Sequence, residues 1–255
     1  MTLLPTADIE NWILLRGLGR ERRHWGEFLD KLKSALPHKK FHCLDLPGSG
    51  ELFQISSPCT VPGIRHQLQQ QQQKLGIKGP LGVIGLSLGG MVSLDWMAAS
   101  NAVAAVVIIN SSANNYPFHW RIRPSSIGLG LRAITSSEVE EQECWVLQMG
   151  SRKHANDPAT IKRWSEIQRR RPVRKITLFK QLLAAAWFSL PDNIFGTPGL
   201  VLTSDSDNMV SSRCSEAIAD HYGWELYCNV GAGHDIPLDD PGWVVAQICR
   251  WVNRP

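Results

Sequence analysis

The chain has 255 residues, of which 43% are hydrophobic and 20% charged, and it carries a formal net charge of +4. This composition is typical of one globular domain with a sizeable core, and it excludes a disordered protein. No apolar stretch is long enough to span a membrane, and the first residues lack the pattern of a signal peptide, so we expect a cytoplasmic protein without a membrane partner. The six cysteines are scattered, which predicts reduced thiols and no metal site.

Six short apolar runs predict the strands of a sheet. They cover residues 12–15, 41–44, 81–84, 104–109, 200–202 and 224–228. Patterns typical of helices lie between and after them, at residues 25–36, 62–75, 91–99, 213–221 and 243–252. Apolar strands that alternate with helices indicate an α/β fold, in which a mostly parallel sheet has helices on both faces.

A long interval separates the fourth predicted strand from the fifth. It is too long for a bare loop, and helical patterns at residues 138–149, 159–169 and 176–188 fill much of it. We therefore expect a core domain of residues 1–112 and 192–255, with a helical lid of residues 113–191 inserted after the fourth strand. Such a lid would cover the carboxyl-terminal edge of the sheet, where ligands bind in open α/β folds.

The motif G-L-S-L-G-G at residues 85–90 connects the third predicted strand to the helix that follows it. In a Gly-x-Ser-x-Gly turn, the serine stands on a sharp bend with its hydroxyl exposed, and the glycines avoid clashes between strand and helix. The motif predicts Ser87 as a nucleophile and the backbone N–H of Leu88 as a donor to an oxyanion. A glycine-rich turn that only packs tightly is the alternative.

A nucleophilic serine needs a base, and the base needs an acid that orients it. His234 lies in a glycine-rich loop after the last predicted strand and can reach the sheet edge where Ser87 stands. The loop after residues 200–202 offers two acids, Asp207 and Asp205. We expect Asp207 to be the triad acid, while Asp205 is the alternative and would otherwise hold the turn. The order Ser, Asp, His is the one expected for this fold class.

The oxyanion needs a second backbone donor, from the loop after the first predicted strand. This loop reads R-G-L-G at residues 16–19, and the N–H of Leu18 is the expected donor. The two glycines are also compatible with a simple flexible turn.

The net charge is distributed unevenly along the sequence. Residues 115–190 contain 13 Lys or Arg and 6 Asp or Glu, whereas the rest of the chain is mildly acidic. A basic lid favours an anionic substrate or an acidic partner, although a solvated helical surface explains the same charge. No recognition motif accompanies it, so we expect no nucleic-acid partner.

Together these motifs resemble the α/β-hydrolase superfamily over nearly the whole chain. The motif D-L-P-G-S-G at residues 45–50 is similar to the D-x-P-G-x-G turn of that family, and Trp25 in the first helix also fits. Within the superfamily, residues 85–90 and 147–150 are most similar to small carboxylesterases, the pimeloyl-acyl-carrier-protein methyl ester esterases. The resemblance is specific for the fold and the triad.

Two departures from this family stand out. The family has His-Gly where this chain has Arg16 and Gly17, which places a permanent cation near the expected site. Arg16 either binds a substrate carboxylate or forms a local salt bridge, and we favour the salt bridge. Only fifteen residues precede Arg16, so we expect the sheet to lack one or two of the superfamily's first strands.

The sequence thus predicts a serine hydrolase that cleaves small to medium carboxylic esters through an acyl-enzyme, with neither cofactor nor metal. The candidates for the wall of an acyl pocket are aromatic residues of the lid, although packing within the lid explains them equally well: Trp120, Trp145, Trp164, Trp187, Phe118 and Phe188.

Three alternatives remain open at this stage. One is an esterase or thioesterase that acts on substrates carried by an acidic acyl carrier protein, which would bind the basic lid. Another is a cofactor-free perhydrolase or carbon–carbon bond hydrolase, because these use similar triads. The last is a binding protein that kept the fold and lost turnover.

Overall fold

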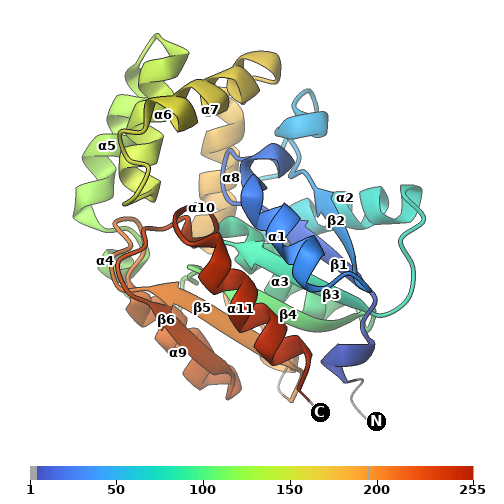
Figure 1. The fold of residues 1–255 in the computed structure, drawn as a ribbon. Coiled ribbons are helices and arrows are strands. Elements are labelled where there is room, and N and C mark those ends of the chain that lie inside the picture. Colours follow the sequence, from blue (N-terminus) through green and yellow to red (C-terminus); the bar gives the residue numbers. More distant parts are fainter. Residues whose placement is uncertain (1–4, 195, 255) are drawn as a thin grey trace.

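The computed structural model describes residues 5–194 and 196–254. Its centre is a sheet of six parallel strands in the order β2-β1-β3-β4-β5-β6 (Figure 1). The strands are β1 (Asn11–Leu15), β2 (Lys40–Leu44), β3 (Leu81–Leu86), β4 (Val103–Ile109), β5 (Gly199–Ser204) and β6 (Glu225–Asn229).

Helices cover both faces of the sheet, and each face has its own apolar core. On one face, Ile13 and Val83 pack with side chains of α2 (Val61–Lys74), α3 (Leu88–Ala99) and α9 (Ser212–Tyr222). On the other face, Trp12 and Ile84 pack with α1 (Glu27–Ala35) and α11 (Pro241–Val252). Successive strand residues point to opposite faces, so strands buried on both sides need the nearly continuous apolar runs found in the sequence.

In the described part of the chain, five α-helices lie between β4 and β5, and we call their segment, residues 118–187, the helical insertion. They are α4 (Phe118–Arg121), α5 (Pro124–Thr135), α6 (Val139–Gly150), α7 (Pro158–Arg170) and α8 (Lys175–Trp187). Figure 1 shows α5, α6 and α7 grouped at one end of the sheet, away from both chain ends. A small core of Leu147, Trp164 and Ile167 joins α6 to α7.

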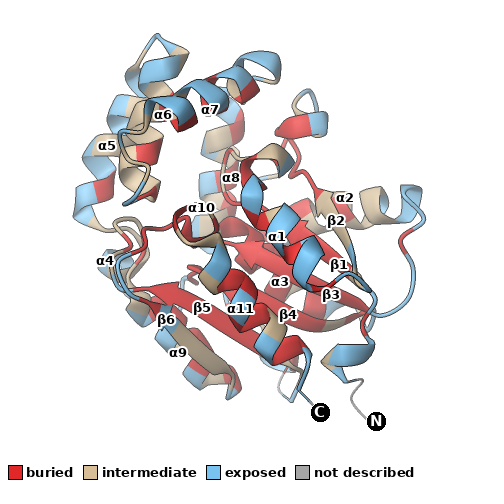
Figure 2. Ribbon diagram, in the orientation of Figure 1, coloured by how far each residue is buried: buried red, intermediate tan, exposed pale blue. Residues whose placement is uncertain are grey.

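Burial differs between the sheet and the insertion. Every residue of β3 and β5 is buried, whereas α5 to α8 are largely exposed or half-buried (Figure 2). Among the described residues, eight of the eleven large apolar side chains that are exposed belong to the insertion. They are Phe118, Ile127, Leu131, Ile134, Ile176, Phe179, Leu182 and Trp187. The insertion therefore presents apolar surface that the core does not cover.

The predicted α/β fold is confirmed, and each predicted strand lies within two residues of an observed one. Among the described residues the sheet begins at β1, preceded by a 3-10 helix at Thr6–Asp8. Further 3-10 helices lie at Arg22–Trp25, Gly50–Leu52 and Asp192–Ile194. The sequence did not predict α4, α5 or the short α10 (Ile236–Asp239). In the described part of the chain, no helix combines the length and apolarity that crossing a bilayer requires.

Candidate active site

Ser87 occupies the sharp turn between β3 and α3. Its φ of 56° lies in the left-handed region, which is rare for a residue with a side chain. A Cβ at Gly85 would collide with the carbonyl oxygen of Gly89, and one at Gly89 would collide with that of Leu15. The hydroxyl of Ser111 donates to the Ser87 carbonyl at 2.8 Å and helps to hold the turn. Glycine is therefore required on both sides of the serine, as the sequence motif predicts.

His234 lies in the loop between β6 and α10, and its side chain is buried. Its Nδ1 lies 2.7 Å from Oδ2 of Asp207, in the loop after β5. A carboxylate only accepts, so Nδ1–H donates and Nε2 is left facing away from the acid. The other oxygen of Asp207 accepts the N–H groups of Met209, at 2.6 Å, and Val210, at 3.0 Å. These bonds fix the carboxylate toward the imidazole.

Asp205, the alternative acid, points elsewhere. Its Oδ1 accepts the N–H of Gly231 at 2.9 Å and the hydroxyl of Ser206 at 2.9 Å. Asp205 is exposed, and both bonds lie within the two adjoining loops. It holds the turn, which is the structural role that the sequence left open for it.

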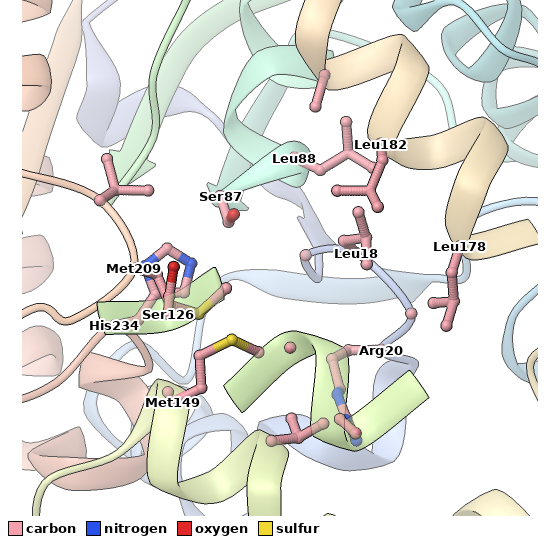
Figure 3. A pocket seen from close by; sticks show the side chains of 18 of the residues that line it. Leu18, Arg20, Ser87, Leu88, Ser126, Met149, Leu178, Leu182, Met209 and His234 are labelled. Carbon is pink, nitrogen blue, oxygen red and sulfur yellow. The ribbon is translucent and has the colours of Figure 1, made fainter. Parts of the chain in front are cut away.

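Ser87 and His234 line the same cavity, together with Leu18 and Leu88. Figure 3 shows the hydroxyl of Ser87 and the ring of His234 both directed into it. These two described side chains are not joined by a hydrogen bond in this structure. The nucleophile and base predicted from sequence are thus brought to one cavity, and the acid lies behind the base.

The pKa of His234 reflects opposing influences. Burial lowers it, but the charge of Asp207 and the hydrogen bond to it raise it, and Asp235 adds to this effect. Arg16 opposes them, and the net result is a pKa above the ordinary histidine value. The surroundings of the ring therefore favour the imidazolium form.

The loop after β1 carries Leu18 beside Ser87. Neither the N–H of Leu18 nor that of Leu88 donates to an acceptor within the described residues. The next N–H, of Gly19, donates to Oε1 of Gln181 at 2.9 Å, and Nε2 of Gln181 donates to the carbonyl of Pro47 at 3.2 Å. Gln181 is fully buried on α8, so the insertion holds the loop through this side chain.

The cavity has a volume of about 410 Å³ and mostly apolar walls. The core contributes Leu18, Leu86 and Met91, and the insertion contributes side chains from α4 to α8, among them Phe118, Ile127, Ile134, Met149, Trp164 and Leu182. Because Phe118, Ile127 and Leu182 are also exposed, the cavity opens to solvent between helices of the insertion. Such a cavity suits an apolar group on the substrate.

Of the six aromatic residues proposed for the pocket, Trp164 and Phe118 line the cavity, whereas the other four lie elsewhere. Trp145 lies under the guanidinium of Arg132, and Trp120 under that of Arg213, at 4.8 and 5.4 Å from the ring centroids. Trp187 is 75% exposed at the end of α8. Phe188 is buried in the core on the α3 face of the sheet.

Arg16 borders the cavity and is buried, as part of an ion pair with Asp235. Both of its Nη atoms donate to the two carboxylate oxygens. The local salt bridge favoured from sequence is therefore present, and the guanidinium is engaged by protein rather than held toward the cavity.

Sequence reasoning missed the contacts between the insertion and the site. Arg20, on the cavity wall, donates to Glu143 of α6 at 2.6 Å. The carboxylate of Asp239 accepts the N–H groups of Gly233 and Arg152 at 2.7 and 2.8 Å. No sequence signal joins these residues, because each pair is far apart in the chain or lies in an unpatterned loop.

No cluster of three potential metal ligands from His, Cys, Asp and Glu occurs among residues 5–194 and 196–254. All six cysteines are free thiols in the structure.

Similar folds are found among solved structures of hydrolases. An enol-lactonase from Burkholderia xenovorans LB400 is 16% identical, with 97% of this chain and 92% of that chain covered and a TM-score of 0.78. An esterase from Exiguobacterium antarcticum is 14% identical, with 96% and 92% covered and a TM-score of 0.74. The esterase RhEst1 from Rhodococcus sp. ECU1013 is 16% identical, with 98% and 92% covered and a TM-score of 0.72. At these identities the likeness concerns the fold alone.

No curated protein sequence matches this chain. The family model described as the alpha/beta hydrolase family, in contrast, matches residues 12–247, which is most of the sequence. This protein therefore belongs to the alpha/beta hydrolase family.

Proposed function

We propose that this protein is a serine hydrolase that cleaves carboxylic esters, with Ser87 as nucleophile, His234 as base and Asp207 as the orienting acid. The observation that carries the proposal is the 2.7 Å bond between His234 and Asp207, beside a cavity that Ser87 also lines. This arrangement leaves the far nitrogen of the imidazole available to a hydroxyl.

In the first step, Ser87 Oγ attacks the ester carbonyl while His234 Nε2 takes its proton. The imidazolium that forms is stabilised by Asp207, and it then returns the proton to the leaving alcohol. Water activated by the same imidazole hydrolyses the acyl-enzyme and regenerates the serine. Every proton in the cycle is thus moved by His234.

The tetrahedral oxyanion would be held by the N–H groups of Leu18 and Leu88. A donor of this kind contributes about 3 kcal/mol to the transition state. Leu88 is the first residue of α3, so the partial positive charge of the helix N-terminus adds to its effect.

The absence of a hydrogen bond between the Ser87 and His234 side chains is compatible with this mechanism. Hydrogen bonds between catalytic groups are often long in a protein without substrate and tighten in the complex. The positive φ of Ser87 already places its side chain at the sharp bend between β3 and α3.

The apolar cavity supports esters with small to medium acyl groups as substrates. A charged acyl group would lose hydration on a wall built of Leu, Ile, Met and Phe side chains. This preference agrees with the resemblance to small carboxylesterases of the pimeloyl-acyl-carrier-protein methyl ester type.

An ester carried by an acidic carrier protein is a second candidate, favoured by the excess of basic residues in 115–190. Attraction between a basic insertion and an acidic carrier weakens with salt. The kcat/KM for a carrier-bound ester should then fall steeply with ionic strength, whereas that for a p-nitrophenyl ester should not.

Labelling with a fluorophosphonate tests the nucleophile directly. The wild-type protein should become covalently labelled on the peptide that contains Ser87, and Ser87→Ala should lose both labelling and hydrolysis of p-nitrophenyl butyrate. Ser93→Ala, six residues after Ser87 and buried within α3, is the matched control and should retain both. Labelling that persists in Ser87→Ala, or a wild type that is never labelled, would refute the proposal.

A further inference from the structure

Arg16 and Asp235 form an ion pair across 219 positions of sequence, between two loops of the candidate site. Arg16 directly follows β1 and precedes the expected oxyanion donor, Leu18. Asp235 directly follows His234. Nη1 of Arg16 lies 3.1 Å from Oδ1 of Asp235, and Nη2 donates to Oδ2. Such a two-pronged bond fixes orientation as well as distance.

The same arginine makes two further contacts, one through its guanidinium and one through its backbone. Its guanidinium carbon lies 4.8 Å from the ring centroid of Trp25, and its side chain is 2% exposed. Its backbone carbonyl packs against Gly89 in the turn after the nucleophile, and a Cβ on Gly17 would meet Ser87 Cβ at 3.2 Å. Arg16 therefore touches the serine turn with its backbone and the histidine loop with its side chain.

We infer that Arg16 is a positioning residue, whose ion pair with Asp235 holds the histidine loop in place against the serine turn and neutralises the carboxylate that adjoins His234. This inference rests on the proposed function, since it assigns Arg16 a role in the reaction of Ser87. Arg16 is therefore not assigned to bind a substrate carboxylate, because both of its Nη atoms already donate to Asp235.

The electrostatic part of the inference follows from the groups around the imidazole. Asp207 faces it from the loop after β5, Asp235 adjoins it on its own loop, and Arg16 lies on the loop after β1. Asp239 of α10 binds the neighbouring N–H of Gly233, Arg152 of the insertion donates to the carbonyl of Ser206, and Cys214 of α9 lies near Asp207. Burial raises the pKa of Cys214 to about 12, so its thiol is neutral.

Within this set, Asp235 raises the pKa of His234 and Arg16 lowers it. Removing one member of the pair exposes the other's charge to the imidazole. Arg16→Gln should therefore raise the pKa of His234, and Asp235→Asn should lower it. The double variant removes both charges and should return the pKa close to the wild-type value.

The experiment measures two quantities in the full-length wild type, the two single variants and the double variant. The first is the pKa of His234, from the NMR titration of its ring proton. The second is the rate of fluorophosphonate labelling against pH. We expect both midpoints to move by roughly one pH unit, upward in Arg16→Gln and downward in Asp235→Asn.

Two further variants separate positioning from general stability. Arg16→Lys keeps the charge but loses the two-pronged bond, so the midpoint should stay near wild type while the maximal labelling rate falls roughly tenfold or more. Arg65→Gln removes a half-buried ion pair with Asp95, at 2.7 Å between α2 and α3. It should lower the unfolding temperature and leave the midpoint unchanged.

Shifts in the same direction for both single variants, or no shift in either, would overturn the inference. If Arg16→Gln does not fold, Asp235→Asn alone tests the inference. A pKa of His234 that stays unchanged or rises in Asp235→Asn would contradict the inference. A wild type that resists labelling refutes the proposed hydrolase, whereas the NMR titration still reports whether the pair controls the imidazole.

Discussion

His234 Nδ1 lies 2.7 Å from Asp207 Oδ2, whereas Asp205, two residues earlier in the same loop, binds the N–H of Gly231 instead. The two acids are nearly indistinguishable in sequence. Their different environments explain the choice, because Asp207 is buried beside the imidazole and Asp205 is exposed.

This difference predicts unequal effects of the two amide substitutions. Asp207→Asn should lower kcat by about 10⁴, because the amide stabilises the wrong imidazole tautomer. Asp205→Asn should lower it less than tenfold. Steady-state hydrolysis of p-nitrophenyl butyrate measures both, and a larger loss in Asp205→Asn would reverse the assignment of the acid.

The raised pKa of His234 predicts the pH dependence of the reaction. The base must be neutral to accept the serine proton, so activity is lost as pH falls through this pKa. The midpoint of the acid limb of kcat/KM should therefore lie above about 6.5, the ordinary histidine value. In Asp207→Asn, burial and Arg16 still lower the pKa of His234, whereas the charge of Asp207, which raises it most, is gone. The residual activity should therefore extend to lower pH. A limb that stays in place would show that His234 is not the base.

Most of the sheet could be predicted from sequence because its strands are buried on both faces and so are continuously apolar. Helix α5 could not be predicted, because Gly128, Gly130 and the β-branched Ile127 and Ile134 oppose a helix. Packing against α6 stabilises this helix, although its residues have a low intrinsic preference for helix. Element type thus follows from sequence where burial is uniform, and fails where tertiary contacts decide.

The candidate site shows the same division. Ser87, His234 and Asp207 were found because each follows a strand end, and parallel strands bring such ends to one edge. The pocket aromatics were only partly predicted, since Trp164 lines the cavity and Trp120 does not, because an aromatic residue in a helix does not reveal which way its side chain points. The Arg16–Asp235 contact was beyond sequence reasoning as a pair, since 219 positions separate its members.

Gln181 provides a test of how the insertion supports the oxyanion loop. Gln181→Leu would leave the N–H of Gly19 and the carbonyl of Pro47 without their buried partner. We expect a loss of about 1–3 kcal/mol in the free energy of unfolding. Because Gly19 adjoins Leu18, kcat should also fall while KM changes little.

The matched control is Gln247→Leu, a buried glutamine on α11 that contacts Arg250 and lies outside the cavity wall. It should leave kcat unchanged. Urea unfolding and ester hydrolysis measure both effects. Equal kcat values for the two variants would show that Gln181 does not support the reaction.

The depth of the cavity can be tested at Gly130, on the face of α5 that lines it. A Cβ there would meet only Met149 Sδ, at 3.8 Å, so a larger side chain fits the helix and extends into the cavity. Gly130→Leu should therefore preserve hydrolysis of p-nitrophenyl acetate and lower kcat/KM for the decanoate at least tenfold, mainly through KM.

Gly128→Leu is the control, because Gly128 lies on the same helix, is exposed, and has no atom within 4 Å of its Cβ position. Both substitutions replace a helical glycine and should stabilise α5 alike, by up to about 1 kcal/mol. A chain-length profile that changes equally in both variants would mean that the acyl group does not occupy the space beside α5.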